Sequence, residues 1–304
     1  MKIACVFPGQ GSQSVGMGRD LYDNFKSARE VFDRADEVVG SSLSRLCFEG
    51  PEDELRQTIN AQPAILTVSY ACLQAVREAN PGFTPPDFVA GHSLGEYTAL
   101  IAAGVVDFAT AVYLARERGR LMHETGTVRP GSMAAVMGLD EVSLSEVCRQ
   151  AGAHVVNINC PGQFVISGDR DNVTRAMELA KDKGASRVIP LPVSAAFHSP
   201  LMQPAVDGMT GIISSLTFGE PVIPIIANTS ARPLTTAESV KAELLAQICS
   251  CVQWQPSIEY MISQGVTVFY EMGPGRVLSG LIKRINREVT TLNIGDAGAV
   301  KSIT

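Results

Sequence analysis

The sequence has no excess of basic charge and no long hydrophobic run, and each shortage excludes a class of partner. Its 25 lysines and arginines are outnumbered by 31 aspartates and glutamates, which gives a formal net charge of −6. Such a chain has no global positive field to hold a nucleic acid or an anionic membrane. No stretch approaches the roughly 20 apolar residues that a membrane-spanning helix requires. We therefore expect neither a nucleic acid nor a membrane as partner.

Histidines are few and cysteines are scattered, which argues against a metal site. Among the four histidines no two stand four residues apart, and the Cys249 and Cys251 pair has no second half. Zinc sites need such spacings. The odd number of cysteines, seven, is typical of reduced thiols inside a cell. The first apolar run, MKIACVFPG, is too short for a signal peptide. We expect a cytoplasmic monomer with no bound metal or cofactor.

What is present is the composition of a folded globular protein. Apolar residues make up 45% of the chain and charged residues 18%, which excludes disorder. A single core stops growing at about 250 to 300 residues, so 304 residues indicate one large domain that carries an inserted or appended smaller one.

The periodicity of apolar residues predicts where the insertion lies. Residues 2–7 and 87–91 have the pattern of buried strands, and so do 222–226 and 266–270, with helical patterns between them. These alternating elements predict an α/β core with a mainly parallel sheet over residues 1–127 and 195–304. Between the two halves, residues 128–194 follow the order β-α-β-β-α-β of ferredoxin-like α+β folds. Its elements are expected at 133–137, 141–151, 154–158, 164–167, 170–183 and 187–190.

The strongest local motif lies where the second strand ends. There the chain runs from an apolar strand into Gly91-His92-Ser93-Leu94-Gly95 and then into a helical pattern. This context is that of a G-x-S-x-G nucleophile elbow, in which a strained turn exposes the serine hydroxyl. The start of the helix would aim the N–H of Leu94 at an oxyanion. We predict Ser93 as the nucleophile; the alternative is an ordinary turn that contains a serine.

A serine nucleophile needs a base, and elimination favours one histidine. His92 is adjacent to Ser93 and is expected to support the turn, His123 lies near a helix end beside Glu124, and His154 opens a strand. His198 lies where the chain re-enters the core after the insertion, and we predict it as the base. No acidic residue stands near His198 as a third member, so a carbonyl oxygen is expected to orient its ring.

Arg118 is a charged residue in an apolar stripe. On the helix expected at 108–124 its neighbours three and four positions away are Leu114, Ala115, Leu121 and Met122. A buried guanidinium is costly unless it is paired. Its partner is either an internal carboxylate or the carboxylate of a bound ligand, which the planar guanidinium would hold through two hydrogen bonds.

The glycine-rich loop at residues 7–16 follows the first strand. Its glycine spacing fits neither a dinucleotide fingerprint nor a phosphate-binding loop. Backbone amides of such a turn still suit an anion, so the N–H of Gln10 is a candidate second oxyanion donor.

Several ordered motifs together resemble one family. These are FPGQGSQ (7–13), GHSLGEY (91–97), RGRLM (118–122), NINCPGQFVISG (157–168), AFHSPLM (196–202), VQW (252–254) and EMGPGRVLSGLIKRI (271–285). Over nearly its whole length the chain resembles the malonyl-CoA:acyl carrier protein transacylases. The resemblance implies a hydrolase-like α/β core that carries a ferredoxin-like insertion.

The resemblance also implies a reaction. Ser93 would take a malonyl group from malonyl-CoA as an ester and pass it to the phosphopantetheine thiol of acyl carrier protein. His198 would act as base and then as acid, and Arg118 would bind the malonyl carboxylate. The oxyanion would lie between the N–H groups of Gln10 and Leu94. The backbone carbonyl of Gln253 would orient His198.

Three further residues take their interpretation from the resemblance. Asn159 matches an asparagine near the family's site, without an assigned chemical role. Phe197 matches the loop that is selective for malonyl, where its bulk disfavours an α-methyl group. Cys160 stands where many relatives have serine and would place a thiol near the cleft.

Other interpretations stay open. A serine esterase or thioesterase would share Ser93 and His198 but pass the acyl group to water, and a docking subunit would only bind the carrier. A free-standing chain is expected to serve fatty acid synthesis, with polyketide synthesis as the alternative. Acyl carrier proteins are acidic, so we expect docking on basic residues. The candidates are Arg187, Arg276, Lys283, Arg284 and Arg287.

Overall fold

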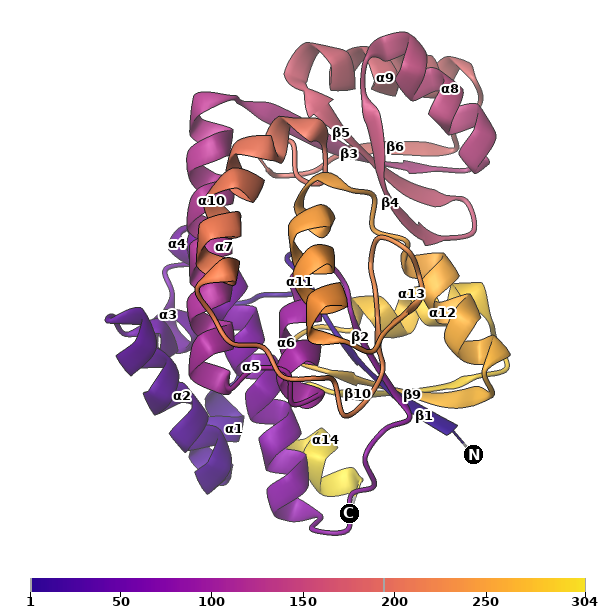
Figure 1. Ribbon diagram of the computed structural model, residues 1–304. Helices are drawn as coiled ribbons and strands as arrows, with labels where there is room; N and C mark the ends of the chain where they lie inside the picture. The colour runs from indigo at the N-terminus through magenta and orange to yellow at the C-terminus, as the bar shows by residue number, and fades with distance from the viewer. Residues whose placement is uncertain (1, 194, 304) are drawn as a thin grey trace.

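A twisted, mainly parallel sheet forms the centre of the larger part of the molecule (Figure 1). The computed structural model describes residues 2–193 and 195–303. The strand order is β10-β9-β1-β2-β7-β8, and every neighbouring pair is parallel except β7 and β8. The strands are β1 (Lys2–Phe7), β2 (Phe88–Gly91), β7 (Ile225–Ile226), β8 (Pro233–Leu234), β9 (Val266–Met272) and β10 (Thr290–Ile294).

Successive residues of β1 face two different helical layers, because side chains alternate along a strand. Cys5 and Phe7 pack into the larger layer, whereas Ala4 and Val6 face α12 (Trp254–Ser263) and α13 (Val277–Ile285). Both faces of the central strands are therefore buried, which explains their continuous apolar sequence.

The larger layer is built around a long buried helix, α5 (Thr58–Ala79), packed on α7 (Phe108–Val128). Around these two lie α1 (Arg19–Asn24), α2 (Lys26–Val39), α3 (Leu43–Glu49), α4 (Glu52–Arg56), α6 (Gly95–Ala102), α10 (Gln203–Ser214), α11 (Ala237–Ala246) and α14 (Ala297–Ser302), with the short turns η1 (Pro200–Met202) and η2 (Gln247–Cys249). No helix in the described residues is long and apolar enough to cross a membrane.

A separate antiparallel sheet forms the smaller part, with strand order β4-β5-β3-β6. Two helices cover one face of this sheet at the top of the view in Figure 1 and share its apolar core. The predicted β-α-β-β-α-β order is confirmed. The elements are β3 (Gly131–Met137), α8 (Glu141–Ala151), β4 (His154–Cys160), β5 (Gln163–Asp169), α9 (Arg170–Asp182) and β6 (Arg187–Pro190).

The limits of the insertion stay a proposal. Its expected first residue, Val128, is the last residue of α7, and the second sheet begins at Gly131. Its expected last residue, 194, and the chain ends, 1 and 304, lie outside the described residues.

One expectation about the core sheet was wrong, and one strand was missed. The strand expected at 222–226 is reduced to Ile225–Ile226, because Pro221 and Pro224 have no N–H to donate to a neighbouring strand. The edge strand β10 was not predicted, since its alternating exposure leaves only Ile294 fully buried.

A short segment of the core pairs with the edge of the smaller sheet. Val252 pairs in parallel with Asn157 of β4, accepting from the N–H of Ile158 at 2.9 Å and donating to the oxygen of Val156 at 2.8 Å. This pairing holds the edge of the smaller sheet against the core.

Candidate active site

The turn between β2 and α6 has the geometry of a nucleophile elbow. Ser93 has a φ of 51°, a conformation that is strained for any residue with a side chain. A Cβ at Gly91 would lie 1.8 Å from the carbonyl carbon of Gly95, and one at Gly95 would lie 2.0 Å from the oxygen of Phe7. Only glycine fits either position, so the flanking glycines allow the turn to expose Ser93.

His198 meets Ser93 from the chain that follows the insertion. Its Nε2 lies 2.7 Å from the Oγ of Ser93, and its Nδ1 lies 2.7 Å from the backbone oxygen of Gln247. Because a carbonyl only accepts, Nδ1 carries the proton and Nε2 presents a lone pair to the hydroxyl. Burial and the charge of Arg118 lower the pKa of His198 to about 3. The ring is therefore neutral near pH 7, with Nε2 free to accept a proton from the hydroxyl.

The expected role of Gln253 was wrong. The carbonyl that orients His198 belongs to Gln247, at the start of η2. Gln253 stands at the N-terminus of α12, where its own oxygen accepts from the N–H of Ser257 at 3.0 Å. That oxygen is used in the first turn of the helix, so it cannot face the imidazole.

Arg118 is buried as its helical phase predicted, with 1% of its surface exposed. Its Nη2 lies 3.1 Å from the Oγ of Ser93 and 2.7 Å from Oε1 of Gln247, and Nη1 lies 2.7 Å from Oε1 of Gln62. Within the described residues it forms no ion pair with a carboxylate. Neutral amides hold the guanidinium, so its positive charge remains available to an anionic ligand.

The two expected oxyanion donors flank the same serine. Across the described residues, neither the N–H of Gln10 nor that of Leu94 donates a hydrogen bond to the protein. The side chain of Gln10 is anchored by the hydroxyl of Thr58 at 2.8 Å. A Cβ at Gly9 would lie 2.4 Å from the oxygen of His92, so this glycine lets the first loop approach the elbow.

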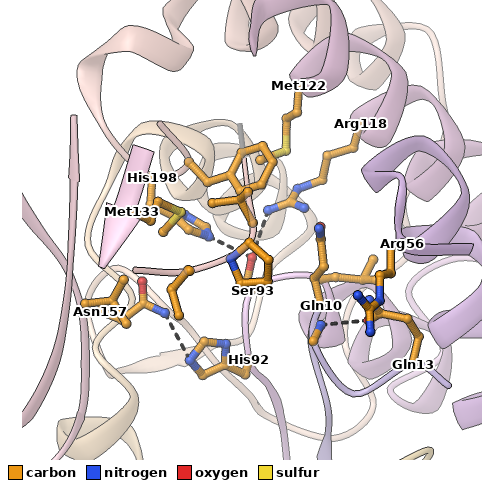
Figure 2. A pocket seen from close by; sticks show the side chains of 17 residues that line it. Gln10, Gln13, Arg56, His92, Ser93, Arg118, Met122, Met133, Asn157 and His198 are labelled. Atoms are coloured by element: carbon orange, nitrogen blue, oxygen red, sulfur yellow. Dashed lines mark hydrogen bonds between the residues drawn. The ribbon is translucent and has the colours of Figure 1, made fainter. Parts of the chain in front are cut away.

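A cavity of about 350 Å³ opens onto Ser93 (Figure 2). Phe197, which the family resemblance placed in this loop, belongs to the apolar wall of the cavity. No cluster of residues that could bind a metal occurs in residues 2–193 and 195–303. The polar lining residues are Gln10, Gln13, Arg56, His92, Ser93, Arg118, Asn157 and His198. The apolar wall is formed by Leu94, Met122, Met133, Val165, Leu191, Pro192, Val193 and Phe197.

His92 turns toward β4 rather than toward Ser93. Its Nε2 lies 3.0 Å from Oδ1 of Asn159 and 3.3 Å from Nδ2 of Asn157 (Figure 2 shows the second contact). Burial lowers the pKa of His92. Asn159 therefore holds the residue next to Ser93. Asn157 was missed, although two asparagines spaced by two on one strand must share a face.

Cys160 does not reach the cavity. It is buried among core residues near Trp254, with its Sγ 3.7 Å from Oε1 of Gln163. The expected thiol near the cleft is therefore enclosed, and burial raises the pKa of Cys160.

Comparisons with known proteins agree with one another. The acyl transferase domain family model matches residues 4–297. A Bacillus subtilis protein named malonyl CoA-acyl carrier protein transacylase is 46% identical, with 99% of this chain and 95% of that protein covered. The Escherichia coli K12 protein of the same name is 41% identical, over 98% and 97%.

Solved structures are similar over the whole chain. An acyl-carrier-protein-S-malonyltransferase from Bartonella henselae has a TM-score of 0.96 at 41% identity, covering 100% of this chain and 98% of that one. A malonyl-transacylase solved in complex with a type II PKS acyl-carrier protein has a TM-score of 0.95 at 39% identity, covering 99% and 98%.

Proposed function

The chain belongs to the acyl transferase domain family, among the malonyl CoA-acyl carrier protein transacylases, and on that premise we propose that it transfers malonyl from malonyl-CoA to acyl carrier protein. One observation carries the proposal. The Oγ of Ser93 lies within hydrogen-bonding distance of both the His198 base, at 2.7 Å, and the buried Arg118 guanidinium, at 3.1 Å. A nucleophile beside a fixed positive charge suits an acyl group that ends in a carboxylate.

In the first half-reaction Ser93 attacks the thioester carbonyl of malonyl-CoA while His198 Nε2 takes the hydroxyl proton. The N–H groups of Gln10 and Leu94 stabilise the tetrahedral oxyanion, each worth on the order of 3 kcal/mol. Collapse breaks the carbon–sulfur bond, and the coenzyme A thiolate leaves with the proton held by His198. A malonyl ester of Ser93 remains.

The second half-reaction runs the same steps in reverse on the carrier. His198, neutral again, takes the proton of the phosphopantetheine thiol, and the thiolate attacks the ester carbonyl. Collapse forms the new thioester and returns the proton to the Oγ of Ser93. Because one site serves both carriers in turn, ping-pong kinetics are expected.

Hydrolysis is the competing fate of the malonyl ester. We expect the protein, given malonyl-CoA and acyl carrier protein, to form malonyl carrier much faster than free malonate. The measurement is the ratio of the two products by mass spectrometry, with carrier lacking phosphopantetheine as the control. Malonate release at the full turnover rate without any carrier would make the protein a thioesterase instead.

The depressed pKa of His198 predicts an unusual pH profile. Catalysis needs the neutral ring, and kcat/KM reports the ionisation of the free enzyme. With a pKa of about 3 rather than 6.5, kcat/KM for malonyl-CoA should stay high below pH 6.5. In Arg118→Ala the charge that helps to lower the pKa of His198 is gone, so the fall of kcat/KM at acidic pH should begin at a higher pH. A wild-type decline centred at 6.5 or above would contradict this.

We propose that the carrier docks beside α13. Arg276 and Arg287 are exposed there, and Gly275 approaches Ser12 in the loop whose neighbours Gly11 and Gln13 line the cavity. Of the remaining candidates, Arg187 is exposed on β6, Lys283 donates to the oxygen of Val289 at 2.5 Å, and Arg284 donates to Gln163 at 2.6 Å.

Charge reversal tests this surface. Arg276→Glu with Arg287→Glu should raise the KM for the acidic carrier about tenfold at low salt, because opposite charges steer association. Acylation by malonyl-CoA should be unchanged. Arg175→Glu, an exposed reversal on α9, is the matched control, and an unchanged KM in the double variant would exclude this patch.

Fatty acid synthesis is the pathway we propose, with polyketide synthesis as the alternative. The alternative is kept because one similar structure contains a type II PKS acyl-carrier protein. We also propose a monomer that acts in the cytoplasm, since one chain supplies every residue of the site and its cysteines are free thiols.

A further inference from the structure

Glu96 is a buried carboxylate that the proposed mechanism does not use. It follows Ser93 by three residues on α6 and has 0% of its surface exposed. Its Oε1 accepts from the backbone N–H and from Nδ2 of Asn228, both at 3.0 Å, and its Oε2 accepts from Nε2 of Gln247 at 2.5 Å. Burial and the Glu243 carboxylate raise the pKa of Glu96. Every one of these partners is a donor, so the contacts fit the ionised form.

Gln247 connects Glu96 to the reacting groups. Its Nε2 donates to Glu96 and to the oxygen of Ser93 at 2.9 Å, while its Oε1 accepts from Arg118. Its backbone oxygen accepts from His198. An amide side chain has one donating and one accepting end, so the partner at one end decides what the other end presents.

Asn228 connects Glu96 to the strained turn. Its Oδ1 accepts from the N–H of Ser93 at 2.7 Å, and its Nδ2 donates to the oxygen of Gly91 at 2.7 Å. Glu96 is thus connected by hydrogen bonds to the elbow through Asn228 and to the guanidinium of Arg118 through Gln247.

We propose that Glu96 is a positioning residue that sets the preference for acyl groups ending in a carboxylate, by forcing the oxygen of Gln247 to face Arg118. This inference rests on the proposed malonyl transfer. A carboxylate offers only acceptors, so the NH₂ of Gln247 must face Glu96. The opposite end, Oε1, then holds Arg118 in place beside Ser93.

The substitution Glu96→Gln should disrupt the connection through Gln247 and keep the one through Asn228. The backbone N–H and the Nδ2 of Asn228 both donate to Oε1 of Glu96, so the amide oxygen of Glu96→Gln should take that position. The new NH₂ therefore meets the NH₂ of Gln247. Relieving that clash turns the Gln247 amide over and presents its NH₂ to Arg118. Nη2 of the guanidinium then loses its acceptor, while Nη1 keeps Gln62. The hydrogen bonds between Asn228 and the elbow are kept, and the elbow loses only the one that the oxygen of Ser93 accepts from Gln247.

The experiment compares acylation of Ser93 by malonyl-CoA and by acetyl-CoA in the full chain, followed by intact mass. In Glu96→Gln the kcat/KM for malonyl-CoA should fall about 30-fold, mainly through KM, since a hydrogen bond to a charged group is lost. Acetyl transfer should change less than about threefold, because acetyl has no carboxylate to place. Equal losses on both substrates would overturn the inference.

Three variants sharpen the result. Glu96→Asp keeps an anionic acceptor and should keep the malonyl preference. Glu271→Gln is the matched control, because Glu271 is a buried glutamate that accepts from the backbone N–H groups of Leu278 and Ser279. This variant should keep the wild-type preference for malonyl-CoA. In an Arg118→Ala background, Glu96→Gln should cause no further loss on malonyl-CoA, and an additive loss would contradict a path through Arg118.

Folding is checked separately. If Glu96→Gln does not fold, Gln247→Leu removes the connecting amide but keeps the backbone carbonyl on His198, and it should show the same selective loss. A wild-type protein that does not transfer malonyl would refute the proposed function. A wild type that transfers malonyl, with a Glu96→Gln variant of unchanged preference, would refute only the role of Glu96.

Discussion

Ser93→Ala is expected to lower malonyl transfer by at least about 10⁴-fold and to abolish the stable malonyl adduct on the protein. The hydroxyl that would form the ester is the one 2.7 Å from His198. Without it neither half-reaction has a covalent intermediate, and the two carriers cannot use one site in turn. The measurement is the intact mass after malonyl-CoA, together with the rate of carrier loading.

Ser69→Ala is the matched control, because Ser69 is fully buried, whereas Ser93 is partly exposed, and Ser69 does not line the cavity. It should be acylated and transfer malonyl as the wild type does. Full transfer by Ser93→Ala would point to another nucleophile. Full carrier binding without any transfer by the wild type would favour the docking-subunit interpretation.

Arg118→Ala is expected to lower kcat/KM for malonyl-CoA by about 10² to 10³-fold, the cost of losing one partner of a buried charge pair. For acetyl-CoA the kcat/KM of the same variant should fall less than about threefold, since acetyl carries no charge for the guanidinium to bind. Single-turnover acylation with both substrates gives the two losses directly. The kcat/KM of Arg118→Lys for malonyl-CoA should lie between those of the wild type and Arg118→Ala, because lysine keeps the charge but not the planar pair of donors.

Arg116→Ala is the comparison on the same helix. Arg116 is half-buried and donates to the oxygen of Ile59 at 2.9 Å and to Asn60 at 2.7 Å, away from Ser93. Its loss should leave the malonyl preference intact. If Arg118→Ala instead lowered kcat/KM equally for both substrates, Arg118 would be a structural residue and would not bind the carboxylate.

Local rules predicted much of the fold. The helix expected at 141–151 and the strand expected at 187–190 occur with those bounds. Their limits follow from nearby residues: Asp140 accepts from the N–H of Ser143 at the start of the helix, and Gly152 adopts a left-handed conformation at its end. The edge strand β10 has no such clear pattern, because only part of it is buried.

The sequence by itself determined the elbow, the histidine at the return from the insertion and the burial of Arg118. Each depends on spacing within one segment: strand, turn and helix for Ser93, and helical phase for Arg118. Only the tertiary structure decided that Gln247 rather than Gln253 orients His198, and that Glu96 meets Gln247. Those partners are 49 and 151 residues apart, and such contacts depend on how separate loops return to one sheet edge, which no local periodicity encodes.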